Sequence, residues 1–193
     1  FEDWKTAVEG VDFVIGGVSS FGVDWFLTEV LAHLDPSVPV LSVTKGLINL
    51  EDGTLISYPD YWQRELAKMG IEREVCGIGG PCTSYELVFH DQTEVAFCGE
   101  NTAVLKMMKE AMATDYYHIS LTNDVIGLES AVALKNGYAL AIAMTIGLVN
   151  RDLGAEAGLH YNSQAGAFYQ AVKEMRYLLE MQGASRDCEN IGI

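Results

Sequence analysis

The sequence has 193 residues, of which 49% are hydrophobic, with 19 glycines and only 4 prolines. A chain of this length can bury one good core, or one domain with part of a second. The composition excludes a disordered or low-complexity protein. The formal net charge of −15 argues against nucleic-acid binding, which requires a basic surface. Because such a chain repels anionic ligands, each conspicuously placed lysine is informative.

The sequence indicates neither a membrane segment nor a metal site. The apolar stretch Ala131–Val149 is interrupted by Lys135 and Asn136, so it falls short of the roughly 18 continuous apolar residues that a membrane helix needs. The four cysteines show no C-x-x-C spacing, and the four histidines show no metal-ligand spacing. We therefore expect a soluble, cytoplasmic protein that binds no metal and no membrane.

Strand and helix patterns alternate through the first 120 residues. The expected strands are Val11–Ile15, Val38–Val43, Glu74–Ile78 and Glu94–Cys98, and the expected helices are Trp25–Leu34, Tyr61–Met69 and Ala103–Ala113. This alternation predicts an α/β fold with a largely parallel sheet that is covered on both faces.

The pattern changes after Tyr116–Ser120, where strand signals cease. A helix of more than twenty residues is predicted to begin near Thr122 or Asn123, and a second is predicted over Asn162–Gln182. We therefore place a domain boundary near residue 120, with an all-helical region after it.

Lys135 lies within the first of these helices and is the first candidate for chemistry. On a helical wheel it shares a face with Leu128, Ala131, Val132, Tyr138, Ala139 and Ile142. Either its stem covers apolar surface at the rim of the helix, or a dry site lowers its pKa so that it can protonate a carbonyl oxygen. The pattern alone gives the two interpretations equal weight. Asn136 beside it could hydrogen-bond a substrate hydroxyl.

Lys45 lies in Ser42–Gly46 at the carboxyl end of a predicted strand, where open α/β sheets bind ligands. Taken alone, an ordinary solvated lysine is the favoured interpretation by about two to one. The glycine-rich segments Gly16–Ser20 and Gly77–Cys82 each allow two interpretations, because such turns either let a ligand approach the backbone or simply end strands. Glu129 is interpreted as an acidic residue favourably placed near a helix start.

Taken in order, the motifs resemble the NAD(P)-dependent glycerol-3-phosphate dehydrogenase family. The matching segments are Val11–Ser20, Ser42–Gly46, Gly80–Glu86, Asn123–Glu129 and Ala133–Asn136. The resemblance implies a partial Rossmann-type doubly wound sheet followed by an all-helical substrate domain. Residues 1–120 would be the C-terminal part of the NAD(P)-binding domain, and residues 121–193 the N-terminal part of the substrate-binding domain.

The resemblance also implies a reaction, the interconversion of dihydroxyacetone phosphate and glycerol 3-phosphate with NAD or NADP, as used in glycerol-3-phosphate metabolism and phospholipid biosynthesis. Lys135 would act at the substrate carbonyl, Lys45 would hold substrate and charge, and Asn136 would bind substrate. The expected partner is a small phosphorylated substrate, and a homodimer is compatible with the resemblance. The expected cofactor-binding residues are Val18, Ser19, Ser20, Phe21, Gly80 and Ser84.

The sequence also departs from the family pattern. The family's G-x-G-x-x-G segment would precede Phe1 and further active-site motifs would follow Ile193, so we expect a fragment without activity of its own. Ser19 replaces a usual proline, and Gln164 and Gln170 replace basic residues, which removes charge that could bind phosphate. Two alternatives therefore remain: a related dehydrogenase of another small hydroxy or keto acid, and a catalytically silent nucleotide-binding homologue.

Overall fold

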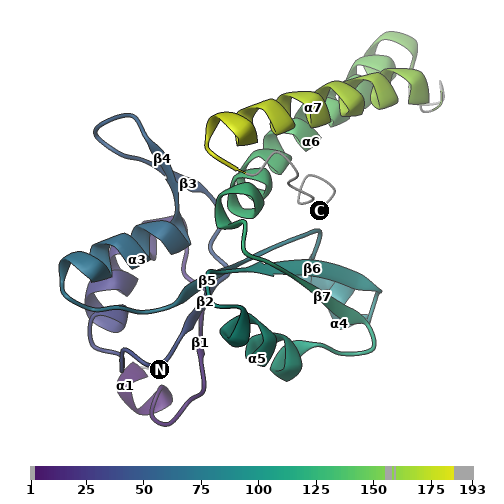
Figure 1. Cartoon of the computed structure of the whole chain (residues 1–193). Helices are drawn as coiled ribbons and strands as arrows, with labels where there is room; N and C mark the ends of the chain where they lie inside the picture. The colour runs from purple at the N-terminus through teal and green to yellow at the C-terminus, as the bar shows by residue number, and fades with distance from the viewer. Residues whose placement is uncertain (1–2, 155–157, 159, 185–193) are drawn as a thin grey trace.

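A computed structural model describes residues 3–154, 158 and 160–184; the chain ends at Phe1 and Ile193 discussed above lie outside these residues. It contains a five-stranded sheet, a two-stranded hairpin and helices on both faces of the sheet (Figure 1). The strands are β1 (Val14–Gly16), β2 (Val40–Ser42), β3 (Leu47–Asn49), β4 (Leu55–Ser57), β5 (Val75–Gly79), β6 (Thr93–Cys98) and β7 (Tyr117–Thr122). The helices are α1 (Trp4–Ala7), η1 (Ser20–Gly22), α2 (Val23–Trp25), η2 (Phe26–Leu31), α3 (Tyr58–Lys68), α4 (Ser84–Val88), α5 (Thr102–Met112), α6 (Val125–Leu153) and α7 (Tyr161–Met181).

The order of strands in the main sheet is β1-β2-β5-β6-β7. The prediction of a largely parallel sheet is confirmed for β1 with β2, β2 with β5 and β6 with β7, and it is wrong for β5 with β6, which are antiparallel. The connection from β5 to β6 carries only the short helix α4, so the chain turns back beside β5 without a crossover over the sheet. The hairpin β3-β4 was not predicted, although its turn contains the hairpin-type pair Asp52-Gly53.

Alternate residues of β2 and β5 pack into separate hydrophobic cores on the two faces of the sheet. Val40 and Val75 pack with α2, η2 and α3, whereas their neighbours Leu41 and Cys76 pack on the opposite face with α5. Helix α6 lies on the first face, where it packs against β6. This arrangement confirms the expected Rossmann-type α/β fold, with helices on both sides.

The same face of the sheet carries a row of small side chains, which we call the small-residue row: Gly16, Ser42, Gly77 and Cys98. These residues are aligned by strand pairing across β1, β2, β5 and β6. A Cβ on Gly77 would lie 2.2 Å from Glu129 Oε1, closer than atoms can approach. The absence of a side chain here therefore lets α6 pack directly on the sheet.

Gly79, two residues further along β5, is restricted in the same way. A Cβ there would lie 2.4 Å from Val132 Cγ2 and 2.9 Å from Leu128 Cδ1. Neither interpretation of the Gly77–Cys82 segment included helix packing, which explains Gly77 and Gly79 because α6 occupies the space above them.

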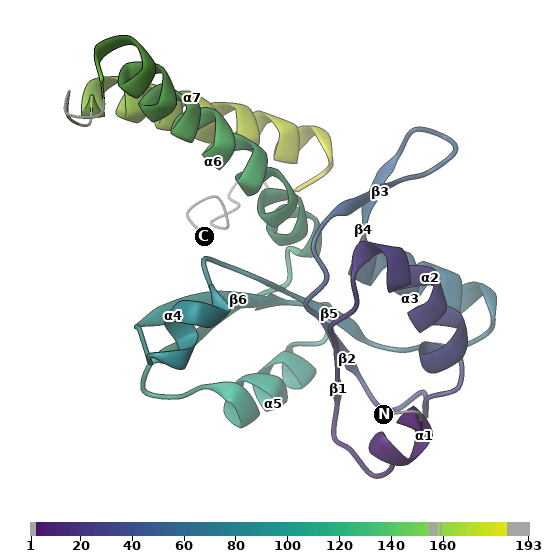
Figure 2. The ribbon, with the colours of Figure 1, turned by 180° about the vertical axis from the view of Figure 1, so that it is seen from behind.

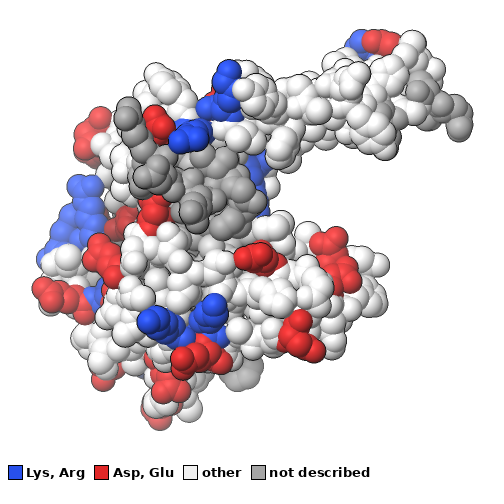
Figure 3. Space-filling model, turned by 45° about the vertical axis from the view of Figure 1, so that its right-hand side comes forward, with Lys and Arg blue, Asp and Glu red and all other residues white. Residues whose placement is uncertain are grey.

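Helices α6 and α7 form an arm that extends away from the sheet (Figures 1 and 2). At its base, Ala131 of α6 packs with Met175 and Leu179 of α7. Much of the remaining arm exposes apolar side chains, and in the view of Figure 3 its outer part shows few charges except near its far end. The exposed apolar residues of the arm include Leu140, Met144, Leu148, Leu153, Phe168, Tyr169, Tyr177 and Met181.

Helix α6 has 29 residues and a hydropathy of 1.5 over its most apolar window, so by length and composition alone it could cross a membrane. The interrupted apolar run did not predict this property. The first turns of α6 are buried against the sheet through Leu128 and Val132, whereas only 6% of the apolar window is buried. The expectation of no membrane partner stays a prediction.

Replacing Gly79 by alanine should destabilise the fold, because the new methyl group would displace the side chains of Leu128 and Val132. We expect the free energy of unfolding to fall by about 1–3 kcal/mol in urea denaturation. The matched control is Gly137→Ala on α6, where a Cβ meets no atom within 4 Å. That substitution should be neutral or slightly stabilising. Equal unfolding midpoints for Gly79→Ala and wild type would contradict the packing argument.

Candidate active site

Lys45 lies in the loop that follows β2, as predicted. Part of its side chain is exposed, but its ammonium end points inward and donates a hydrogen bond to the carbonyl oxygen of Ile78 on β5. The preceding residue fixes this loop to its neighbour, since Thr44 Oγ1 donates to the carbonyl oxygen of Val18 at 2.8 Å. The loops after β1 and β2 are thereby held together at one edge of the sheet.

Lys135 reaches the same edge from α6. Its side chain is half-buried, and Nζ donates to the carbonyl oxygen of Gly80 at 2.6 Å. The start of α6 is fixed by its N-cap, where Asp124 Oδ1 accepts from the Gly127 amide at 2.9 Å. Lys45 and Lys135 are 90 positions apart in the sequence, yet both ammonium groups are held by carbonyl oxygens at the end of β5. We call this pair the two-lysine site.

The two-lysine site disfavours positive charge. Burial lowers the pKa of Lys135, with the Cys82 thiol acting weakly in the opposite direction. Burial also lowers the pKa of Lys45, and the nearby Lys135 ammonium lowers it further, whereas Glu129 raises it. An amine whose pKa is lowered gives up its proton more readily, which suits proton transfer.

Glu129 is the residue that sequence reasoning missed. It is 1% exposed, lies over the small-residue row, and accepts a long contact of 3.9 Å from Cys98 Sγ through Oε1. Its Oε2 accepts no hydrogen bond from the described residues. Burial raises the pKa of Glu129 to about 7, although the Lys45 charge acts to lower it. Placement near a helix start does not account for such complete burial; its spacing three residues before Val132 was the available signal.

The residues expected to contact the cofactor follow two strands. Val18, Ser19, Ser20 and Phe21 form the loop and short helix η1 after β1, and Phe21 is 98% exposed. Gly80 follows β5 and has a φ of +146°, and a Cβ there would lie 2.9 Å from the Glu94 carbonyl oxygen. Glycine is therefore required at Gly80 by the backbone of β6.

Other expected residues lie around this edge or along the arm. Ser84 begins α4 and is exposed, and Asn136 is exposed beside Lys135. Gln170 Nε2 donates to Glu174 on its own helix at 2.8 Å. Because the C-terminal end of α7 packs beside the base of α6, Gln164 near the start of α7 lies toward the far end of the arm.

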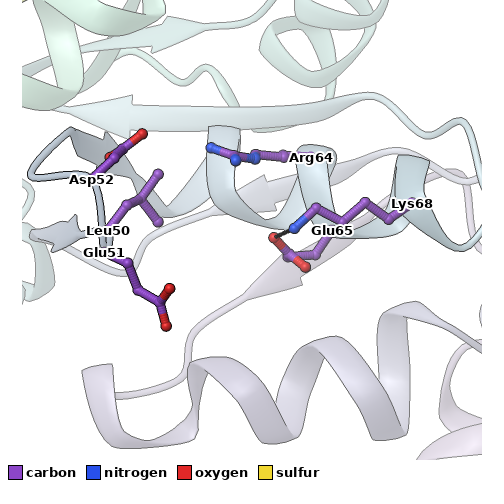
Figure 4. A pocket seen from close by; sticks show the side chains of 6 residues that line it. All are labelled: Leu50, Glu51, Asp52, Arg64, Glu65 and Lys68. Carbon is purple, nitrogen blue, oxygen red and sulfur yellow. Dashed lines mark hydrogen bonds and ion pairs between the residues drawn. The ribbon is translucent and has the colours of Figure 1, made fainter.

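A separate surface hollow lies between the hairpin turn and α3 (Figure 4). Its lining residues are Leu50, Glu51, Asp52, Arg64, Glu65 and Lys68. Three of these side chains are acidic and two are basic, and Lys68 is paired with Glu65 on the same helix, so the hollow does not favour an anion. Among the described residues, no group of three His, Cys, Asp or Glu side chains could hold a metal ion. The two-lysine site is therefore the stronger candidate for chemistry.

Comparison with known proteins identifies similar sequences. Residues 1–105 match the family model described as NAD-dependent glycerol-3-phosphate dehydrogenase N-terminus. The NADP(+)-dependent glycerol-3-phosphate dehydrogenase of Archaeoglobus fulgidus is 30% identical over 96% of this chain and 53% of its own length. A glycerol-3-phosphate dehydrogenase [NAD(P)+] of Leptospira biflexa is 27% identical over 94% of this chain and 51% of its own. The chain thus spans about half the length of the curated relatives it matches.

Solved structures show the same fold. Glycerol-3-phosphate dehydrogenase from Coxiella burnetii superimposes with a TM-score of 0.76 at 22% identity, covering 96% of this chain and 52% of that one. The Plasmodium falciparum glycerol-3-phosphate dehydrogenase gives a TM-score of 0.75 at 19% identity, covering 91% and 45%. At these identities the likeness supports the Rossmann-type fold, and the site residues rest on the geometry above.

Glu129→Gln should change how stability depends on pH. Because the folded carboxyl binds its proton more tightly than the unfolded one, with a pKa of about 7 against 4.5, this group stabilises the fold fully below pH 4.5. Its contribution is lost as pH rises through about 7. The free energy of unfolding of wild type relative to the Gln variant should therefore fall by roughly 3 kcal/mol between pH 4.5 and 8.

The measurement is urea denaturation of both proteins across this pH range. Glu110→Gln, which removes an exposed carboxylate on α5, is the control and should show a much smaller change. A difference between wild type and Glu129→Gln that does not vary with pH would show that Glu129 has an ordinary pKa.

Proposed function

Because the chain belongs to the NAD-dependent glycerol-3-phosphate dehydrogenase family, we propose that the whole protein interconverts dihydroxyacetone phosphate and glycerol 3-phosphate with NAD or NADP. The observation that carries the proposal is the two-lysine site. Lys45 and Lys135 concentrate positive charge at the carboxyl ends of β2 and β5, in a chain whose net charge is −15. Such local charge is what an anionic phosphorylated substrate requires.

The residues at this edge suit the nicotinamide half of the cofactor. Open α/β sheets bind dinucleotides at the carboxyl ends of their strands, where the Val18–Phe21 loop and Gly80 lie. The loop is fixed by Thr44 and keeps Phe21 exposed, so it offers a firm surface beside the lysines. When bound, the reduced nicotinamide supplies a hydride. The relatives are named for NADP or for both nucleotides, and we propose NAD or NADP accordingly.

The two lysines would have different roles in carbonyl reduction. Lys135, whose pKa is lowered by burial, would donate a proton to the substrate oxygen as negative charge develops on it. Lys45 would hold the substrate and compensate charge, and the exposed amide of Asn136 would orient a hydroxyl. Ser19, Ser20 and Ser84 are proposed as cofactor contacts, together with the Val18–Phe21 loop and Gly80.

Several finer features stay proposals. The phosphorylated substrate is proposed from the names of relatives. A homodimer is proposed from the family resemblance, and the absence of nucleic-acid and membrane partners and a cytoplasmic location are proposed from the charge and composition of the sequence. The domain division at residue 120 is also proposed; β7 ends at Thr122 and α6 begins at Val125. We propose that residues 1–193 alone do not turn over, because family members are about twice this length.

Lys135→Ala in the full-length protein should lower the rate of dihydroxyacetone phosphate reduction by about 10²–10⁴-fold, the usual contribution of general acid catalysis. The measurement is NADH or NADPH oxidation, with circular dichroism to verify the fold. Lys106→Ala, which removes an exposed lysine on α5, is the control and should retain wild-type activity. Near wild-type turnover by Lys135→Ala would exclude it as the proton donor.

The same assay distinguishes the alternative functions. Reduction of a small keto acid but not of dihydroxyacetone phosphate would indicate a related dehydrogenase, as the neutral Gln164 and Gln170 permit. Nucleotide binding without turnover of any tested ketone would indicate a silent homologue. Reduction of dihydroxyacetone phosphate with the highest kcat/KM among the tested ketones is the result we expect.

A further inference from the structure

Glu129 is the most deeply buried carboxylate of the described site, and the proposed reaction does not use it. Burying a carboxylate costs free energy unless it is paired or neutralised, so its position calls for an explanation. None of the described residues donates a hydrogen bond to its Oε2. The structure nevertheless provides a place shaped for this side chain.

That place is the small-residue row. The carboxylate rests on Gly77, where any Cβ would collide with Oε1 at 2.2 Å. Ser42 and Cys98 flank Gly77 in the paired strands, so their side chains point to the same face of the sheet. The Cys98 thiol contacts Oε1 at 3.9 Å, and the buried Ser42 hydroxyl has no hydrogen-bond partner among the described residues. Strands β2, β5 and β6 thus leave room for a carboxylate but provide few hydrogen-bond donors to stabilise its charge.

The charged and titratable groups around Glu129 come from three elements. Lys45, from the loop after β2, is the cation that acts on it; Asp60 of α3 opposes its ionisation, and Cys98 of β6 supplies a weak donor. Lys135, from the same helix as Glu129, acts on Lys45. Glu129 Oε1 lies against Gly77, and Lys45 Nζ is bonded to the carbonyl oxygen of the next residue, Ile78. From this position Glu129 offsets the repulsion that Lys45 experiences from Lys135.

We propose that Glu129 is a positioning residue of the two-lysine site, which acts through Lys45 by keeping that side chain a charged ammonium at the end of β5. The role rests on the proposed function, in which Lys45 faces an anionic substrate. Without a counter-charge, burial and the neighbouring Lys135 would both favour the neutral amine. With it, two cations can lie at one edge and bind a phosphorylated substrate.

The buried location has an advantage over a surface ion pair. No ion pair joins Glu129 to Lys45 among the described residues, so the carboxylate acts through space and does not occupy the N–H groups of the ammonium. An exposed carboxylate would be screened by solvent and would compete with the substrate for those donors. Buried between α6 and the sheet, Glu129 can stabilise the charge of Lys45 while the N–H groups that are not bonded to Ile78 remain available.

The direct test measures the titration of Lys45 in the full-length protein. Lysines are reductively methylated with ¹³C-formaldehyde, and the Lys45 resonance, assigned by its loss in Lys45→Arg, is followed against pH. Glu129→Gln should move this titration to lower pH by about one unit, the lower end of the effect of a nearby opposite charge. Glu129→Asp retains the charge and should move it much less, and Glu110→Gln should leave it unchanged.

Glu129→Met is a second neutral variant of similar length, used if Glu129→Gln does not fold. An unchanged Lys45 titration in a folded neutral variant would overturn the proposal. An equal shift in Glu129→Asp and Glu129→Gln would also overturn it, because the shift would then follow packing rather than charge.

The pH profile of activity provides a second measurement. In Glu129→Gln, the alkaline limb of kcat/KM for dihydroxyacetone phosphate should move to lower pH in step with Lys45, whereas a purely structural role would lower activity equally at every pH. A shifted Lys45 titration in a protein that reduces no phosphorylated ketone would support the electrostatic link and refute the proposed function. An active enzyme whose titration and alkaline limb are both unchanged in Glu129→Gln would refute the role of Glu129 alone.

Discussion

The close approach of α6 to β5 is the constraint on which the rest of the structure depends. It is possible because Gly77 and Gly79 present no side chains to the helix, and Leu128 and Val132 fill the space. This contact fixes the rotation and height of α6 over the sheet. Everything that α6 carries follows from it: Lys135 reaches the end of β5, Glu129 lies over the small-residue row, and the base of the arm is anchored.

Part of this arrangement was predictable from local pattern. The β-branched run before Lys45 predicts a strand, and the rule that open sheets bind ligands at carboxyl ends then places the lysine correctly. The apolar face around Lys135 predicts a helix that packs against another part of the protein. The segment against which this face packs could not be inferred, because Lys135 and its hydrogen-bond partner Gly80 are 55 positions apart in the sequence.

Glu129 shows why the remainder was not predictable. Its burial depends on Ser42, Gly77 and Cys98 being aligned in register, which is a property of strand pairing and not of any one segment. The antiparallel direction of β6 could not be predicted either, because the residue pattern of a strand does not indicate its direction. Three-residue strands such as those of the hairpin are too short for a periodic signal, so only the turn residues could have indicated them.

The electrostatics of the site oppose stability, which is typical of sites that bind charged ligands. Burial raises the pKa of Glu129 and lowers those of Lys45 and Lys135, so each group is held in surroundings that disfavour its charged form. Removing the charges would relieve this cost. Their retention makes sense if an anionic ligand completes the balance: two ammonium groups and one buried carboxylate leave a net positive edge. The packing of α6 on the glycines of β5 then supplies the free energy that holds these charges together.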